Sequence, residues 1–146
     1  MAVPEWGKSP RDSIERECER RGKDEVVAGC MALLRGEGAD PELLYALGGP
    51  PASWALTGTE PGPDYWMRVW AARGLLWAWD DEALPCIMTA LDDQAWRVRE
   101  MALKVVARHR LHAASTQVAS LRSDPNPRVA SAANRVHVSL AVRDGG

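Results

Sequence analysis

Apolar residues between Asp93 and Ala107 recur at the three- and four-residue spacing of one helix face, so this stretch predicts an amphipathic helix. Within it, Val98, Arg99, Ala102 and Val105 form a pattern that recurs once on each side at a period of 31 residues. The matching sets are Met67, Arg68, Ala71 and Gly74 before it, and Val129, Ala130, Ala133 and Val136 after it. Self-similarity at one fixed period between helical segments is typical of a stacked helical-repeat protein.

The period divides residues 64–142 into three units, each beginning with a long amphipathic segment. Residues 64–79 are followed by a shorter apolar segment at about 82–91, and residues 93–109 by another at 112–122. The third unit, residues 125–142, is expected to start its helix at Pro125 and has no second helix. Such an open end is compatible with a monomer or a weak homodimer.

Residues 1–63 do not keep the period. Ser9 and Pro10 predict the start of a helix that ends near Arg21, and Asp24 predicts the start of a second one, so residues 1–35 are compatible with a degenerate repeat. Residues 36–63 contain three turn-rich sequences, GEGAD, GGPP and GTEPGP, around a short helix that follows Asp40. We interpret residues 36–63 as an insertion, which in repeat proteins often lies on the binding face.

The form V-R-x-x-A-L-x-x-V, preceded by Asp and followed by a short helix ending in Leu, resembles HEAT-like repeats of the phycobilisome-lyase type. The resemblance covers residues 64–142 and is best over 93–122. It implies an all-α fold, a right-handed α-solenoid of HEAT-like helical hairpins with an irregular N-terminal segment, in one domain spanning 1–146. It also implies that Asp93 and Arg99, six residues apart, belong to an Asp–Arg pair that ties neighbouring repeats together. At the same spacing Gly62 precedes Arg68 and Ala130 follows Asp124, so the pair is lost there.

Tryptophan and arginine share one stripe of the first helix, because Trp66, Trp70, Arg73 and Trp77 are spaced at i, i+4, i+7 and i+11. One period later the same stripe contains Arg97, Lys104 and Arg108. Two interpretations remain open. Either the insertion covers the tryptophans with its own apolar side chains (Leu43, Leu44, Leu47, Trp54 and Leu56), or the stripe is open and binds a partner, since tryptophan and arginine dominate binding hot spots.

Charge is distributed unevenly along the 146 residues. Residues 1–90 hold nine Lys or Arg and fifteen Asp or Glu, a net charge of −6, whereas residues 91–146 hold nine and five, a net charge of +4. This asymmetry favours an anionic partner near the C-terminal end or head-to-tail contact. Three widely spaced cysteines without a CxxC motif argue against a disulfide framework and a zinc site.

These features predict a non-catalytic scaffold or adaptor that binds an unidentified protein partner through Trp66, Trp70, Arg73, Trp77, Arg97, Lys104 and Arg108. Nucleic-acid binding is the alternative, through a basic stripe of Arg97, Lys104, Arg108, Arg128 and Arg135. A glycosylase-like or lyase-like enzyme is a remote third possibility, since no catalytic motif is present.

We expect no cofactor and no metal. The chain has no apolar run long enough to span a bilayer and no signal peptide, so a cytoplasmic location without membrane contact is expected.

Overall fold

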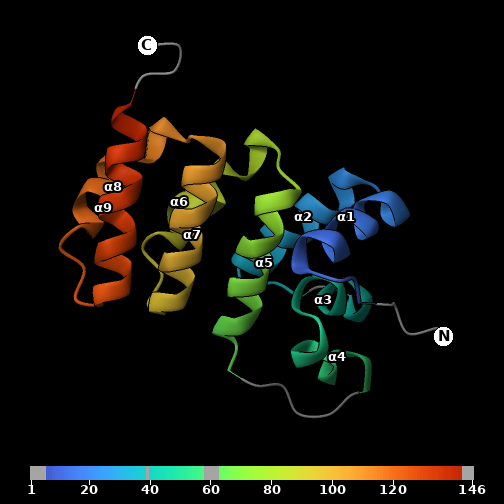
Figure 1. Cartoon of the computed structure of the whole chain (residues 1–146). Coiled ribbons are helices and arrows are strands. Elements are labelled where there is room, and N and C mark those ends of the chain that lie inside the picture. The colour runs from blue at the N-terminus through green and yellow to red at the C-terminus, as the bar shows by residue number, and fades with distance from the viewer. Residues whose placement is uncertain (1–5, 39, 58–62, 143–146) are drawn as a thin grey trace.

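A computed structural model describes residues 6–38, 40–57 and 63–142, and these form helices and connecting turns only. The architecture is an all-helical α-solenoid (Figure 1). Three long helices, α5 (Tyr65–Trp77), α7 (Trp96–His109) and α9 (Pro127–Ala141), lie side by side in one layer. The shorter α6 (Leu84–Ala90) and α8 (Ser115–Leu121) form a second layer behind them, each preceded by a short 3-10 turn, Asp81–Ala83 and His112–Ala114. The two-helix units predicted from the period are therefore confirmed.

The periodic apolar residues face the core of this stack. On α7, Val98, Ala102 and Val105 are fully buried. Their counterparts on the neighbouring helices, Ala71 of α5 and the α9 residues Val129, Ala133 and Val136, are buried as well. Burial of one apolar stripe per helix is the main stabilising contribution in such a layer. Within the described ranges, every helix is too short or too polar to cross a lipid bilayer.

The helix starts in the later repeats differ from the prediction. The helix α7 begins at Trp96, although the pattern starts at Asp93, and α9 begins at Pro127 instead of Pro125. The reason is that Asp93 and Asp124 each accept a hydrogen bond from a backbone N–H two residues further on, at 2.8 Å, which closes a turn before the helix. In α9 the cap is Asn126, whose side chain accepts from the backbone N–H of Arg128 at 2.9 Å.

Ion pairs connect the three long helices. Arg68 of α5 donates to the carboxylate of Asp93 at 2.7 and 3.2 Å, and Arg99 of α7 donates to that of Asp124 at 2.8 and 3.0 Å. Asp93 and Arg99 therefore both form inter-repeat pairs, but with partners 25 residues away. The side chain of Arg99 reaches Asp93 only at its backbone oxygen, at 2.7 Å. The expected loss of the pair in the flanking units was wrong, because each arginine pairs with the aspartate that begins the following unit.

In the described residues of the N-terminal segment the helices are α1 (Pro10–Arg21), α2 (Lys23–Leu34), α3 (Pro41–Gly48) and α4 (Trp54–Thr57), with a 3-10 turn at Pro50–Ala52. Ser9 caps α1 and Asp40 caps α3, as the sequence indicated. Asp24 lies in the first turn of α2 and does not cap it, because the chain turns sharply at Gly22, whose φ of 95° is unfavourable for other residues. The helix α2 packs mainly against α5, opposite the side on which α7 lies.

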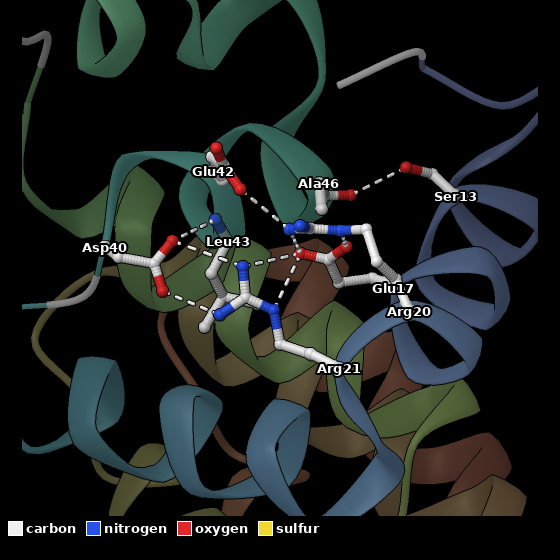
Figure 2. A network of polar contacts seen from close by, with 8 residues as sticks. All are labelled: Ser13, Glu17, Arg20, Arg21, Asp40, Glu42, Leu43 and Ala46. Atoms are coloured by element: carbon white, nitrogen blue, oxygen red, sulfur yellow. Dashed lines mark hydrogen bonds and ion pairs between the residues drawn. The ribbon is translucent and has the colours of Figure 1, made fainter. Parts of the chain in front are cut away.

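A polar network centred on the buried Glu17 joins α1 to α3 (Figure 2). Glu17, only 4% exposed, accepts hydrogen bonds from Arg20 at 2.6 and 2.8 Å and from Arg21 at 2.9 Å. Arg21 also binds Asp40 at 2.6 Å, and Arg20 lies 2.9 Å from a carboxylate oxygen of Glu42. The network fixes α3 in the position from which it covers α5.

Two glycines allow α3 to lie directly on α5. A Cβ atom on Gly74 of α5 would stand 2.7 Å from a methyl carbon of Leu47 and 2.8 Å from the sulfur of Cys30. A Cβ on Gly48 of α3 would stand 2.7 Å from the ring of Trp70. Both distances are far below van der Waals contact, so a larger residue at either position would push the two helices apart.

Candidate partner-binding surface

The predicted tryptophan stripe on α5 is covered at its centre. Trp70 is 6% exposed and packs against Gly48 of α3. Its neighbour Trp66 stacks on it, with ring centroids 6.4 Å apart, and remains partly exposed. The insertion contributes Leu43, Leu44 and Leu47 to the same hydrophobic core. The interpretation that the insertion covers the stripe therefore holds for Trp70, while Trp66 reaches the surface.

Arg73 turns toward the N-terminal segment. Its Nη2 atom donates to the backbone oxygen of Leu47 at 2.7 Å. Its Nε atom is buried and has no hydrogen-bond partner among the described residues. Burial lowers the pKa of the Arg73 guanidinium, because a charged group loses hydration inside the protein. This arginine is thus separated from the exposed cations of α7.

Side chains from three adjacent repeats form an alternating line at the N-terminal ends of the long helices. The guanidinium carbon of Arg97 lies 5.3 Å from the ring centroid of Trp66 and 4.4 Å from that of Trp96. The guanidinium carbon of Arg128 lies 5.1 Å from the ring centroid of Trp96. We call Trp66, Arg97, Trp96 and Arg128 the tryptophan–arginine row. Each contact is within the range of a cation–π interaction.

Sequence reasoning missed Trp96, although a signal for it was present. At the 31-residue period Trp96 matches Tyr65, so two consecutive units carry an aromatic residue at the same place, immediately before the stripe position. In the structure Tyr65 stacks on Trp66 at a centroid distance of 5.3 Å. The aromatic residue repeated at this position could have identified Tyr65 and Trp96 as parts of the candidate surface.

The other end of the stripe is also flanked by arginine. Arg108 of α7 lies 4.3 Å from the ring centroid of Trp77, and Arg11 of α1 lies 4.9 Å from it. Arg108 also donates to the backbone oxygen of Leu76 at 2.7 Å. Lys104 lies between the two ends on the same face of α7 and is exposed. The structure thus brings five of the seven predicted residues to α5–α7 contacts or to this shared face, whereas Trp70 and Arg73 contact α3.

The cations on this face differ in how far they are neutralised. Arg128 forms an ion pair with Glu100 at 3.1 Å, and Arg135 donates to the hydroxyl of Ser131 at 2.9 Å. Within the described part of the chain, Arg97 and Lys104 form no ion pair or hydrogen bond. Of the five basic residues in the predicted stripe, Arg128 alone has a carboxylate partner among the described residues, and Arg97 and Lys104 also lack a hydrogen bond.

A pocket of about 490 Å³ opens beside the covered part of the stripe. The insertion provides one wall and α5 the other. Its lining consists of Gly48, Pro51, Trp54, Pro63, Trp66, Met67, Trp70 and Arg73. Among the described residues that line the pocket, Arg73 is the one that carries a charge.

His109 takes a structural position at the end of α7. Its Nε2 atom lies 2.8 Å from the backbone oxygen of Leu75, and its ring stacks on Trp79 at a centroid distance of 4.6 Å. Burial lowers the pKa of His109, which favours the neutral ring in this place. In the described ranges, no three His, Cys, Asp or Glu side chains cluster closely enough to hold a metal ion.

Comparison with known proteins gives one match. The family model described as HEAT repeats matches residues 52–136, which is more than half of the 146-residue chain. The match is to HEAT repeats in general and does not single out the phycobilisome-lyase type. No curated protein and no solved structure matches the chain. The matched segment contains α5 to α8 and most of α9, which are the helices that carry the stacked layers and the inter-repeat ion pairs. The chain therefore belongs to the family of HEAT-repeat proteins.

Proposed function

We propose that this chain is a protein-interaction scaffold that binds an acidic segment of a partner protein across α5, α7 and α9. HEAT repeats are commonly protein-interaction scaffolds, and the fold alone carries no chemistry. The observation that carries the proposal is Arg97, which is held between two tryptophan rings and has no carboxylate partner among the described residues.

The tryptophan–arginine row combines the two residue types that contribute most to binding hot spots. Because the rings of Trp66 and Trp96 hold the Arg97 side chain in place, little of its rotamer freedom remains to be lost on binding. An incoming carboxylate would bind the guanidinium edge while apolar side chains of the partner cover the rings. Lys104 extends the positive charge along the same face.

The same face supports nucleic-acid binding less well. Phosphate binding needs a row of available cations. Of the five basic residues in the predicted stripe, Arg108 is bonded to a backbone oxygen, Arg128 is paired with Glu100, and Arg135 is bonded to Ser131. The whole chain also carries a net charge of −2, which opposes long-range attraction of a polyanion.

Site-specific photo-crosslinking tests the proposal. A photoreactive amino acid in place of Lys104 should give a discrete crosslinked adduct in a cell extract, and a Glu-rich peptide should suppress this adduct while a Lys-rich peptide should not. The matched control places the same amino acid at Arg122, an exposed residue after α8 that bonds Asn134. Equal adducts at both positions, or competition by both peptides alike, would contradict the proposal. Crosslinking to RNA or DNA in place of protein would favour the nucleic-acid alternative.

A further inference from the structure

We propose that the pocket between the insertion and α5 binds a small planar aromatic carboxylate. The pocket shares Trp66 with the tryptophan–arginine row, but the proposal depends on Arg73, Trp54 and Trp70, which lie outside that row. The HEAT-repeat match assigns no ligand to this pocket, whose lining is shared between the insertion and α5.

The walls of the pocket are suited to a flat apolar body. Trp54 from α4 and Trp66 and Trp70 from α5 contribute indole side chains to the lining, and Met67 adds a polarisable one. Aromatic rings prefer offset-stacked or edge-to-face contacts with other aromatic rings, and methionine sulfur makes favourable contacts with them. A ligand with a single aromatic ring or two fused rings would therefore contact tryptophan or methionine side chains on several sides.

Arg73 determines the polar group of the ligand. Its guanidinium has five N–H donors, and one donor is accounted for by the backbone oxygen of Leu47. No carboxylate pairs with Arg73 in the described ranges, and its Nε atom is buried without a partner. A partly buried cation without a counter-charge is costly, and an anion bound in the pocket would offset that cost.

The positive charge of Arg73 and the volume of the pocket favour a small anionic ligand. A cationic ligand would be repelled by Arg73, whereas a neutral ligand would leave its guanidinium unpaired. A carboxylate matches the planar guanidinium and accepts two parallel hydrogen bonds. A volume of about 490 Å³ lies within the roughly 300–1,000 Å³ of small-molecule sites.

Calorimetric titration of the full chain with 2-naphthoate, and with its neutral analogue 2-naphthylmethanol, tests the proposal. We expect saturable binding of 2-naphthoate, and binding of the alcohol weaker by at least roughly tenfold, because the alcohol cannot supply the charge-assisted pair. Equal affinities for both compounds, or no heat from either, would overturn the proposal. This comparison uses the wild-type chain, so it does not depend on how a variant folds.

Variants then locate the site. Arg73→Gln should remove the preference for the carboxylate, and Trp54→Ala should weaken both compounds by removing a wall. The matched control is Trp79→Phe, because Trp79 stacks on His109 away from the pocket and should leave both titrations unchanged. Lys104→Ala should also leave them unchanged, which separates this site from the partner-binding surface. An unchanged carboxylate preference in a folded Arg73→Gln variant would contradict the assignment.

Discussion

The two ends of this molecule use arginine–carboxylate pairs in different ways. Among the repeats, each pair joins one arginine to one aspartate 25 residues ahead, and the Arg68–Asp93 arrangement recurs as Arg99–Asp124. In the N-terminal segment, Glu17 binds two arginines, which also contact Asp40 and Glu42 on α3 (Figure 2). The inter-repeat pairs connect equivalent units, whereas the Glu17 network holds one particular helix, α3, against α5.

The difference shows how a repeat stack can be closed at one end. The exposed side of a helical repeat would leave an apolar surface in water unless another element covered it. Here α2 and α3 lie on α5, and α3 places Leu47 against Gly74 and Gly48 against Trp70. The N-terminal segment therefore buries the tryptophan stripe at its centre, and the repeats beyond it leave the tryptophan–arginine row at the surface.

The largest expected effect comes from breaking an inter-repeat pair. In Arg99→Ala, the carboxylate of Asp124, with a side chain only 4% exposed, would lose its arginine, and the backbone oxygen of Asp93 would lose its donor. We expect a loss of about 3 kcal/mol in the free energy of unfolding, measured by urea denaturation. The matched control is Arg135→Ala on α9, which is exposed and should stay within about 0.5 kcal/mol of wild type. Equal stability of the two variants would contradict a stabilising role for the pair.

A smaller effect is expected in the N-terminal network. Glu17→Gln keeps the size of the side chain but replaces charge-assisted hydrogen bonds to Arg20 and Arg21 with weaker ones. We expect a loss of about 2 kcal/mol in the same urea assay. Glu15→Gln on the same helix is the control, because Glu15 and its partner Arg11 are both more than half exposed, and it should change stability by less than about 0.5 kcal/mol. If the two variants were equally stable, the network would not hold α1 to α3.

The smallest expected effect is on the stability of the protein at acidic pH, where the inter-repeat pair and the N-terminal network can be compared directly. Burial opposes ionisation of Asp124, but the hydrogen bond and the charge of Arg99, together with the backbone N–H of Asn126, outweigh burial and hold the pKa of Asp124 below its ordinary value of 3.8. The hydrogen bond from Arg21 lowers the pKa of Asp40 in the same direction. A lowered pKa in the folded state contributes stability above the unfolded-state pKa, and this contribution is lost as pH falls through the folded-state value.

Stability should therefore decline as the pH is lowered past 3.8, and Asp124→Asn should make this decline shallower. Asp40→Asn should change the decline of stability with pH by a smaller amount, because the Asp40 side chain is 50% exposed and solvent screens its pair with Arg21. Thermal denaturation of the three proteins as a function of pH measures this. An Asp124→Asn variant with an unchanged acid dependence would show that the Arg99 pair does not control it.

The sequence predicted the repeats well because their signals are local and periodic. Val98, Ala102 and Val105 mark a buried stripe, and the 31-residue period transfers that stripe to the flanking helices. The same comparison places Gly74 where the other units have Val105 and Val136. The reason is visible only in the structure, because Leu47 and Cys30 occupy the space that a valine would fill.

The candidate surface was predicted less completely, for a physical reason. Helical spacing placed Trp66, Trp70 and Arg73 on one stripe, but it could not show that α3 buries Trp70 and draws Arg73 inward. The partners of Asp93 and Arg99 were missed because contacts across 25 residues depend on how helices stack and not on spacing within one helix.

The most direct test of the account is the photo-crosslinking yield at position 104 in two otherwise identical chains, one with Arg97 and one with Arg97→Ala. Circular dichroism would first establish that both are folded. We expect the Arg97→Ala chain to fold, because Arg97 contacts tryptophan rings and forms no ion pair in the described part of the chain. The account predicts that the adduct suppressed by a Glu-rich peptide is lost in the Arg97→Ala chain. The same yield in both folded chains would contradict the claim that the tryptophan–arginine row binds the partner.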